Sequence, residues 1–392
     1  MIGVGYSTAK NPFRAAHEAA STALSGINGQ ACHSCMVFST VGYPQKTLLE
    51  EIRKEIGEVP MIGCSGSGVI APSLSDESNH CVAVLAIADP RIHLDTSGYP
   101  DVTDSTGAGR EVGEALGRKL RDDARCILVF SCGLDTLIDD LIPEMVKPFQ
   151  RELPIIGGLA ADNLLRVKTY QYHDWQVYEG GICAAVVSGD FDLITDVSHG
   201  CVPIGLEMEV TKVDANRIYE IDGRPVLDVM TECVGEGIVR DFGKAALHFC
   251  IGQQSDPDLI DCYDQYSIRY IAKLYPEDGS IALPVKMRKG DRIWLTRRDR
   301  DKMFAACHRS IDKLAVKIEG RRPFLVLNIN CVGRGKIVLA DKEKNDLLSS
   351  FQTSLAPGIP WIGFFSYGEF CPVEERNTFH NYTEVLALFV WR

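Results

Sequence analysis

The sequence predicts an α/β protein that is largely parallel and built from repeated strand-helix units. Short, continuously apolar stretches alternate with amphipathic helical stretches, which is typical of strands buried on both faces of a sheet. The same arrangement recurs three times, and each copy carries the tetrad Pro-x-Ile-Gly. With 392 residues, the chain is longer than one typical core requires, so we expect two domains.

The chain opens with an apolar strand at Ile2 to Tyr6, and a helix is expected from Asn11 to about Leu24. Asn11 is a suitable N-cap, and Pro12 suits the first helical position. The first copy of the repeat then follows, with a strand at 36–40, a helix from Gln45 to Ile56 and the tetrad at 60–63.

The two later copies repeat this order of strand, helix and tetrad. Their segments are 128–132, 138–149 and 154–157 in the second copy, and 325–331, 347–355 and 360–363 in the third. After each tetrad come a polar loop and another apolar strand. These strands are expected at 81–87, 182–187 and 385–390.

The sequence pattern between the second and third copies is different. Residues from about Asp196 to Arg298 contain alternating strands separated by Gly-containing turns, which indicates an antiparallel, strand-rich segment. We place the boundary between the modules inside this segment, so that an N-terminal module spans 1–224 and a C-terminal module, which this segment opens, spans 225–392.

The composition limits the classes of function. The 41 Lys and Arg against 53 Asp and Glu give a net charge of −12, which argues against nucleic acid as a partner. The 14 Cys are scattered through a long chain, as expected for reduced thiols in a cytoplasmic protein rather than for a disulfide scaffold. No apolar run approaches the length of a membrane span, so we expect no membrane insertion.

Several short segments resemble the FIST sensory proteins, named for F-box and intracellular signal transduction. Pro60 to Ser65, His199 to Gly205 and Val210-Thr211 are similar to the N-terminal module of that family. The C-terminal module is similar in order and spacing at Ile268-Arg269, 278–281, 289–291, 331–335, 363–369 and 380–383. The resemblance covers nearly the whole chain.

The resemblance implies an intracellular sensor of a small molecule in signal transduction, and not an enzyme. Its partners would be separate signalling proteins, such as a histidine kinase or a cyclic-di-nucleotide enzyme. Amino acids are ligands proposed for the broad family, whereas a subset of stand-alone bacterial members binds haem and senses nitric oxide. Haem is therefore the cofactor to consider, and no other cofactor or metal is expected.

Ligands of parallel sheets gather beyond the carboxyl ends of the strands, where the repeat places polar and small residues. The candidate ligand-binding residues are Gly63, Cys64, Ser65, Ser131, Gly157, Asp162, Asn163, Arg334, Ser366, Tyr367, Gly368, Glu369, His380 and Asn381. Arg334 could clamp a carboxylate while Glu369 or Asp162 takes an ammonium group, which would suit an amino acid. Alternatively, Arg334 and Glu369 pair with each other and the glycines serve turns.

His199 is the candidate haem ligand, because the family more usually has glutamine before this Gly-Cys. His380 belongs to the family's own motif, so a structural hydrogen bond is as plausible for it as ligation. The alternative function is an enzyme in which a thiol or hydroxyl at a strand end attacks a small molecule, although no Cys/His or Ser/His spacing supports it. Cys32 and Cys35 have the spacing of a redox pair or half a zinc site, but ordinary thiols are the favoured interpretation.

Overall fold

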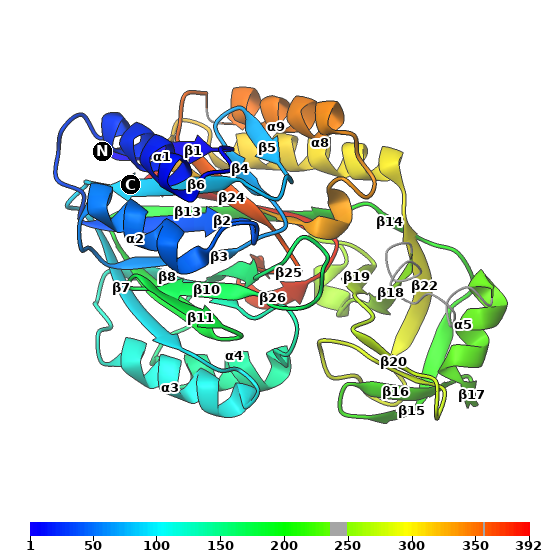
Figure 1. Ribbon diagram of the computed structural model, residues 1–392. Helices are drawn as coiled ribbons and strands as arrows, with labels where there is room; N and C mark the ends of the chain where they lie inside the picture. Colours follow the sequence, from blue (N-terminus) through cyan, green and yellow to red (C-terminus); the bar gives the residue numbers. More distant parts are fainter. Residues whose placement is uncertain (236–248, 356) are drawn as a thin grey trace.

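The computed structural model describes residues 1–235, 249–355 and 357–392, and most of the chain forms three copies of one α/β unit (Figure 1). Each unit consists of strand, helix, strand, helix, strand, a two-stranded hairpin and a final strand. The first unit contains β1 (Ile2–Ser7), α1 (Pro12–Gly26), β2 (Ser34–Ser39), α2 (Gln45–Ile56), β3 (Met61–Ser65), β4 (Val69–Ala71), β5 (Leu74–Asp76) and β6 (Val82–Ile87).

The second and third units repeat this order. The second contains β7 (Ile92–Tyr99), α3 (Ser105–Gly117), β8 (Ala124–Ser131), α4 (Ile138–Val146), β9 (Ile155–Leu159), β10 (Tyr170–His173), β11 (Gln176–Glu179) and β12 (Ile182–Gly189). The third contains β13 (Phe191–His199), α8 (Arg300–Lys317), β23 (Arg322–Cys331), α9 (Asp341–Leu355), β24 (Trp361–Ser366), β25 (Gly368–Val373), β26 (Arg376–His380) and β27 (Thr383–Trp391).

Each unit donates its hairpin to the sheet of another unit. The β4–β5 hairpin of the first unit pairs with β24 of the third, the β10–β11 hairpin of the second pairs with β3 of the first, and the β25–β26 hairpin of the third pairs with β9 of the second. The three six-stranded sheets therefore have equivalent orders, namely β1-β6-β2-β3-β10-β11, β7-β12-β8-β9-β25-β26 and β13-β27-β23-β24-β4-β5.

The expectation of a largely parallel fold is wrong. Within the described residues, each of these sheets has one parallel pair (β2–β3, β8–β9 and β23–β24), and its other pairs are antiparallel. The reason is that the last strand of each unit returns antiparallel between the first and second strands. Continuous apolar runs show that both faces of a strand are buried, but they do not show which way its neighbours run.

Both faces of each sheet are buried because the three sheets meet at the centre of the molecule. Their inner faces share one apolar core, in which the rings of Phe38, Phe130 and Phe364 lie with centroids 4.7 to 5.7 Å apart. The outer faces are covered by α1 with α2, α3 with α4, and α8 with α9 (Figure 1). The strands are thus enclosed between a sheet-to-sheet core and an outer helical layer.

The glycine of each Pro-x-Ile-Gly tetrad is required for the same steric reason in each unit. A Cβ atom at Gly63 would lie 1.8 Å from the carbonyl oxygen of Val37, and one at Gly157 would lie 1.9 Å from that of Val129. Glycine is therefore required where the two parallel strands of a unit approach each other. The predicted N-cap of the first helix is confirmed, because the Asn11 side chain accepts a hydrogen bond from the Arg14 backbone N–H at 3.1 Å.

The strand-rich segment leaves the third unit after β13 and returns at α8, and it forms a smaller, antiparallel lobe (Figure 1). We call residues 200–299 the inserted lobe and the three units the core. The lobe contains β14 (Cys201–Pro203), β15 (Met208–Asp214), β16 (Arg217–Ile221), β17 (Arg224–Pro225), α5 (Val226–Val234), β18 (Phe249–Gln254), η1 (Pro257–Leu259), β19 (Tyr266–Arg269), β20 (Lys273–Tyr275), β21 (Ser280–Ala282) and β22 (Arg292–Arg298). The boundary expected between 224 and 225 falls inside β17.

Candidate functional site

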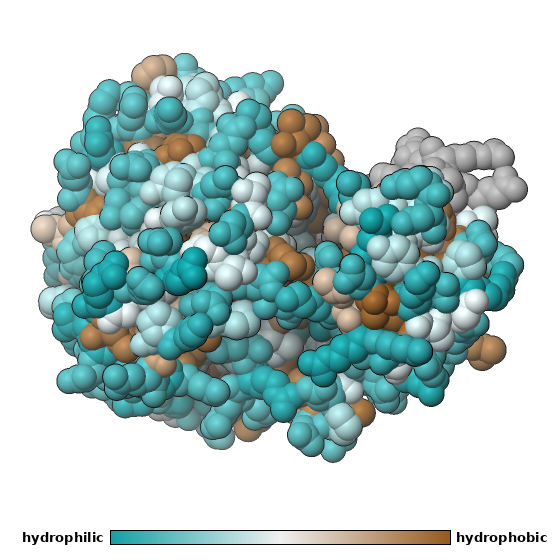
Figure 2. Space-filling model, turned by 90° about the horizontal axis from the view of Figure 1, so that it is seen from below, coloured by the Kyte–Doolittle hydropathy of each residue, from teal (hydrophilic) through white to brown (hydrophobic). Residues whose placement is uncertain are grey.

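A cleft between the core and the inserted lobe contains two cavities. Seen from below, the surface is hollowed between the two parts of the molecule, with apolar side chains along the furrow (Figure 2). The first cavity has a volume of about 510 Å³ and the second about 400 Å³. Both volumes lie in the range typical of small-molecule sites.

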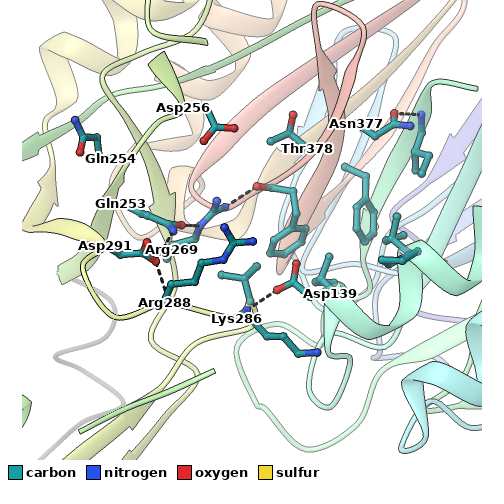
Figure 3. A pocket seen from close by; sticks show the side chains of 17 residues that line it. Asp139, Gln253, Gln254, Asp256, Arg269, Lys286, Arg288, Asp291, Asn377 and Thr378 are labelled. Atoms are coloured by element: carbon teal, nitrogen blue, oxygen red, sulfur yellow. Dashed lines mark hydrogen bonds between the residues drawn. The ribbon is translucent and has the colours of Figure 1, made fainter. Parts of the chain in front are cut away.

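The first cavity combines a charged side with an apolar wall (Figure 3). Its apolar wall belongs to the core and contains side chains from α4, β9 and the β25–β26 hairpin, namely Ile138, Ile142, Ile155, Phe370 and Phe379. Most of its charged side chains belong to the inserted lobe, namely Asp256, Arg269, Lys286, Arg288 and Asp291, and Asp139 at the start of α4 completes the set.

Arg269 occupies the junction of the core and the lobe. Its Nε donates to Gln253 Oε1 at 2.9 Å, and its Nη1 donates to the Phe379 carbonyl of the core at 2.7 Å. No carboxylate of the described residues forms an ion pair with it, and burial lowers its pKa from the ordinary value. Asp139 and Asp291 lie near enough to attract this half-buried guanidinium, but neither is in ion-pair contact with it, so an anion in the cavity can bind it directly.

A second guanidinium reaches the same space. Arg288 is exposed, and its backbone is tied to Asp291, whose Oδ2 accepts the Arg288 N–H at 2.9 Å and whose N–H donates to the Arg288 carbonyl at 3.1 Å, while its guanidinium makes no hydrogen bond within the described part of the chain. Figure 3 shows the guanidinium groups of Arg269 and Arg288 pointing into the cavity. Asp291 also accepts a hydrogen bond from Gln253 Nε2 at 3.2 Å, so this carboxylate organises the cavity wall.

The acidic groups of the cavity lie on both sides of the cleft. Asp139 accepts a hydrogen bond from the Lys286 backbone N–H, and Lys286 Nζ donates to Asp140 at 2.5 Å. Asp256 of the lobe pairs with Arg376 of the core. The cavity therefore offers positive groups for a carboxylate and negative groups for an ammonium ion.

The second cavity adjoins the first and is lined by Tyr367, one of the predicted residues. Its other lining side chains include Arg166 from the core and Tyr270 from the lobe, with the Arg166 guanidinium 4.9 Å from the centre of the Tyr270 ring. Tyr367 donates its hydroxyl hydrogen to Asp162 at 2.5 Å. Among the fourteen candidate ligand-binding residues, Tyr367 is the one that lines either of the two cleft cavities.

Two other predicted residues, Ser65 and Asp162, bind the backbone of neighbouring loops. The Ser65 hydroxyl donates to the Ala161 carbonyl at 2.8 Å and accepts from the Tyr170 backbone N–H at 3.0 Å. Asp162 accepts backbone N–H groups of residues 166, 167 and 168 at 2.7 to 3.0 Å. These bonds stabilise the loops that join the units. The side chains of Ser65 and Asp162 therefore bind backbone groups and do not line either of the two cleft cavities.

The remaining small residues of that set also have structural roles. Gly63 and Gly157 lie inside strands, and burial raises the pKa of the Cys64 thiol well above its ordinary value. Ser131 is buried and shares a hydrogen bond of 2.9 Å with Thr136. A Cβ at Gly368 would lie 2.5 Å from the Phe379 ring, so this glycine permits the β25–β26 hairpin to pack.

The two asparagines connect separate segments. Asn163 Nδ2 donates to Asn79 Oδ1 at 2.9 Å and thereby ties the second unit to the first. Asn381 Oδ1 accepts the Tyr270 backbone N–H at 3.0 Å, and its Nδ2 donates to the Tyr367 carbonyl at 3.2 Å. Asn381 therefore links the core to the wall of the second cavity.

Arg334 is fully buried and does pair with a carboxylate, but the partner is Glu384 and not Glu369. Arg334 Nη2 lies 3.1 Å from Glu384 Oε2 and 3.1 Å from Cys307 Sγ, and its Nε donates to Asn330 at 3.2 Å. The side chains of Arg334 and Glu384 are 1% and 4% exposed. The pair lies in the interior of the third unit, away from both cavities.

Glu369 is also fully buried, on β25. It accepts hydrogen bonds from the Ser366 hydroxyl at 2.5 Å and from the Thr383 hydroxyl at 2.8 Å. Burial raises the pKa of Glu369 to about 7, against these hydrogen bonds, which lower it. Glu369 and Ser366 therefore form a buried polar cluster of the third unit.

The two histidines are enclosed by aromatic rings. His199 Nδ1 accepts the Cys201 backbone N–H at 3.1 Å, and its Nε2 lies 3.3 Å from Asp264 Oδ2. His380 donates from Nε2 to the Cys371 carbonyl at 3.1 Å, and burial lowers its pKa to about 3. In a neutral ring whose Nδ1 accepts, Nε2 carries the hydrogen and has no lone pair for iron. His199 and its neighbours do not fit a haem ligand site.

Most of the first-cavity residues that sequence reasoning missed belong to the inserted lobe, whereas Asp139 of α4 belongs to the core. Arg269 and Asp291 fall in the very segments that resemble the FIST C-terminal module, whereas Arg288 lies immediately before one of them. The strand-end rule directed the search to the core, because it applies to parallel sheets. In this largely antiparallel fold, the sequence feature that could have located the cavity is the group of charged residues at the edge of the lobe.

Comparison with known proteins shows relatives of the same length. The chain is 26% identical over 400 residues to the protein named Uncharacterized protein Rv0628c of Mycobacterium tuberculosis, with 99% of each chain covered. It is also 26% identical over 398 residues to Uncharacterized protein Mb0898c of Mycobacterium bovis, covering 99% of this chain and 98% of that protein.

Two solved structures align along nearly the whole chain, but only loosely. A chorismatase has 9% identity and a TM-score of 0.34, covering 99% of this chain and 98% of its own. A cyanuric acid hydrolase has 10% identity and a TM-score of 0.32, covering 100% and 99%. TM-scores this low show neither a shared fold nor a shared activity.

The family models match both parts of the chain. Residues 34–224 match the FIST N domain, and residues 227–372 match the FIST C domain. These two matches leave only short segments unassigned. The chain therefore belongs to the FIST family, as a FIST N domain followed by a FIST C domain.

Proposed function

We propose that this FIST protein is a sensor that binds a small amino acid in the first cavity. The observation that carries the proposal is Arg269, a half-buried guanidinium that faces the cavity without a carboxylate partner in the described residues. A ligand carboxylate would supply the missing counter-charge through paired hydrogen bonds. The proposed site thus moves from the predicted Arg334, which already has Glu384, to the cleft.

The opposite side of the cavity supports a zwitterionic ligand. Asp139 uses one oxygen to accept the Lys286 backbone N–H, and its other oxygen has no hydrogen-bond partner within the described residues. An ammonium group would be attracted to that carboxylate, while an apolar side chain packs on Phe370 and Phe379. Together these groups distinguish an amino acid from a simple carboxylic acid.

The position of the cavity supports signalling by a change in the arrangement of the lobe. A ligand held by Arg269 of the lobe and Asp139 of the core would bridge the cleft. It would then favour one arrangement of the two parts, because a ligand shifts an equilibrium only by its differential affinity for the two states. A separate cytoplasmic partner, such as a histidine kinase or a cyclic-di-nucleotide enzyme, would recognise that arrangement.

The surroundings of the thiols and hydroxyls favour binding over catalysis. Burial raises the pKa of both Cys64 and Cys331 well above the ordinary value, which disfavours the nucleophilic thiolate. The Ser65 and Ser366 hydroxyls already donate to a carbonyl and to a carboxylate inside the core.

Among the described helices, none combines the length and the hydropathy of a bilayer span.

The test is a ligand screen with matched arginine variants. Thermal unfolding of the full chain is measured with each of the twenty amino acids, and the affinity of any that stabilises it is determined by calorimetry. Arg269→Gln is expected to weaken binding by about 10-fold to 100-fold, the range for losing a hydrogen bond to a charged group. Arg297→Gln, on the exposed part of β22, is the control that should bind normally.

Two further measurements keep the proposal falsifiable. Arg288→Gln and Asp139→Asn should each weaken binding as well. These two variants replace Arg269→Gln as the test if that variant does not fold. Stabilisation by none of the twenty amino acids, or equal affinity in the three cavity variants and the wild type, would contradict the proposal. A Soret band after haem addition to the purified protein would instead revive the haem and nitric oxide hypothesis.

A further inference from the structure

The second cavity has its own chemistry, which the amino-acid site does not use. Among the described residues that line it are one cationic side chain, Arg166, and one acidic side chain, Asp135, which is exposed. The rings of Tyr270 and Tyr367 also line it, together with apolar side chains from both parts of the molecule, namely Leu134, Leu137, Leu159, Leu283 and Pro284. We propose that this cavity is a second ligand site, which takes a small aromatic carboxylate and communicates with the first cavity.

The carboxylate would bind Arg166. This guanidinium has no carboxylate contact within the described residues, and it lies over the Tyr270 ring at 4.9 Å. A guanidinium stacked by its face keeps its edge free to donate two parallel hydrogen bonds to a carboxylate. The arrangement therefore leaves the geometry that recognises a planar anion.

Asp162 holds this arrangement in place. Its Oδ1 accepts both the Arg166 backbone N–H at 2.9 Å and the Tyr367 hydroxyl at 2.5 Å. Arg166 itself has a left-handed backbone with φ of 57°, which is uncommon outside glycine and asparagine. One buried carboxylate thus fixes the backbone of Arg166 and the Tyr367 ring relative to each other.

The aromatic part of the ligand would pack between the tyrosine rings and the apolar wall. Tyr270 belongs to the lobe and Tyr367 to the core, so the ligand would contact both sides of the cleft. Flat rings gain additional stabilisation from ring-to-ring contacts that a saturated ring of similar size does not make. This predicts discrimination between an aromatic and a saturated acid.

The two cavities share one wall made of consecutive residues. Arg269 lines the first cavity and Tyr270 the second, while Pro284 lines the second and Val285 the first. The core side of the wall continues this pattern, because the Ile138 backbone N–H of α4 donates to the Pro284 carbonyl at 3.3 Å. A ligand that fixes this wall from one cavity changes the affinity of the other, and the coupling is reciprocal.

The experiment uses benzoate as the probe and the full chain as the protein. We expect saturable binding of benzoate by calorimetry, weakened about 10-fold or more in Arg166→Gln and unchanged in Arg297→Gln. Cyclohexanecarboxylate should bind several-fold more weakly than benzoate. Hydrogen exchange should show increased protection of the backbone at 283–286 when benzoate is bound, and this readout does not depend on the amino-acid proposal.

The opposite results would overturn the inference. Absence of saturable benzoate binding to the wild type would refute a site for aromatic carboxylates. Binding that survives Arg166→Gln but is lost in Arg288→Gln would place benzoate in the first cavity instead. Equal affinity for cyclohexanecarboxylate would refute the aromatic class, and unchanged exchange at 283–286 would refute the coupling. If Arg166→Gln fails to fold, Tyr270→Leu provides the same test from the lobe.

Discussion

Buried charges in the core and charges in the cleft are arranged differently. In the core, Arg334 has Glu384, and Lys344 of α9 lies 2.5 Å from Glu77, which follows the β4–β5 hairpin. In the cleft, Arg269 and Arg288 make no ion pair with the described residues, and the Asp256–Arg376 pair is exposed. A buried charge with a partner stabilises one packed state, whereas a charge without a partner is available to a ligand. The comparison separates groups that hold the fold from groups suited to recognition.

The largest effect is expected from breaking a core pair. Arg334→Met leaves Glu384 buried without its counter-charge, so the free energy of unfolding should fall by about 3–5 kcal/mol in urea denaturation. The double variant Arg334→Met/Glu384→Met should recover part of this loss. A decrease below about 1 kcal/mol would show that the pair is not buried as described. Where Arg334→Met remains folded, full amino-acid affinity would exclude Arg334 as a ligand residue.

A smaller, pH-dependent effect is expected at Glu369. Its pKa is raised from 4.5 to about 7 in the folded state, so on increasing pH the unfolded state loses this proton first and gains stability. The contribution of this group to folding stability is therefore fully retained below pH 4.5, and about 3 kcal/mol is lost as the pH rises to about 7.

Glu369→Gln tests this contribution by comparison with the wild type at each pH. The variant should be relatively more stable above pH 7, and this difference should shrink as the pH falls through the same window. Glu374→Gln, at an exposed turn, is the matched control without such a trend. A stability difference that does not vary with pH would contradict the raised pKa.

The smallest effect is expected from the exposed pair across the cleft. The side chains of Arg376 and Asp256 are 50% and 66% exposed, and solvent screens their attraction. Arg376→Gln should therefore change the free energy of unfolding by no more than about 0.5 kcal/mol. If Arg376→Gln lowered the free energy of unfolding as much as Arg334→Met does, the proposed difference between buried core pairs and exposed cleft pairs would be refuted.

Local features of the fold were predictable, whereas the long-range pairing was not. The helix Gln45–Ile56 and the Asn11 cap follow from side-chain spacing and capping chemistry. The insertion of β6 between β1 and β2 depends on contacts between distant segments, and nothing in the sequence of β6 specifies its direction. The exchange of hairpins between units is non-local for the same reason.

The candidate site was predictable in chemistry but not in position. An arginine and a carboxylate for an amino acid were expected, yet the predicted Arg334 points into the core and the proposed Arg269 comes from the lobe. Tyr367 lines the second cavity, although its predicted neighbours Ser366 and Glu369 face the interior. Tyr367 is the residue between β24 and β25, whereas Ser366 ends β24 and Glu369 belongs to β25, and these two side chains are hydrogen-bonded to each other in the interior.

The exchanged hairpins have a consequence for synthesis on the ribosome. When residues up to the end of β12 have emerged, the β4–β5 hairpin still lacks β24, and β9 still lacks β25. The edge strand β9 and the β4–β5 hairpin therefore lack their partners until the last part of the chain is made, and unpaired edges promote misassociation. The β4–β5 hairpin thus gains its partner only after β24 has been translated, and the sheet of the second unit is complete only after β25 and β26 have followed.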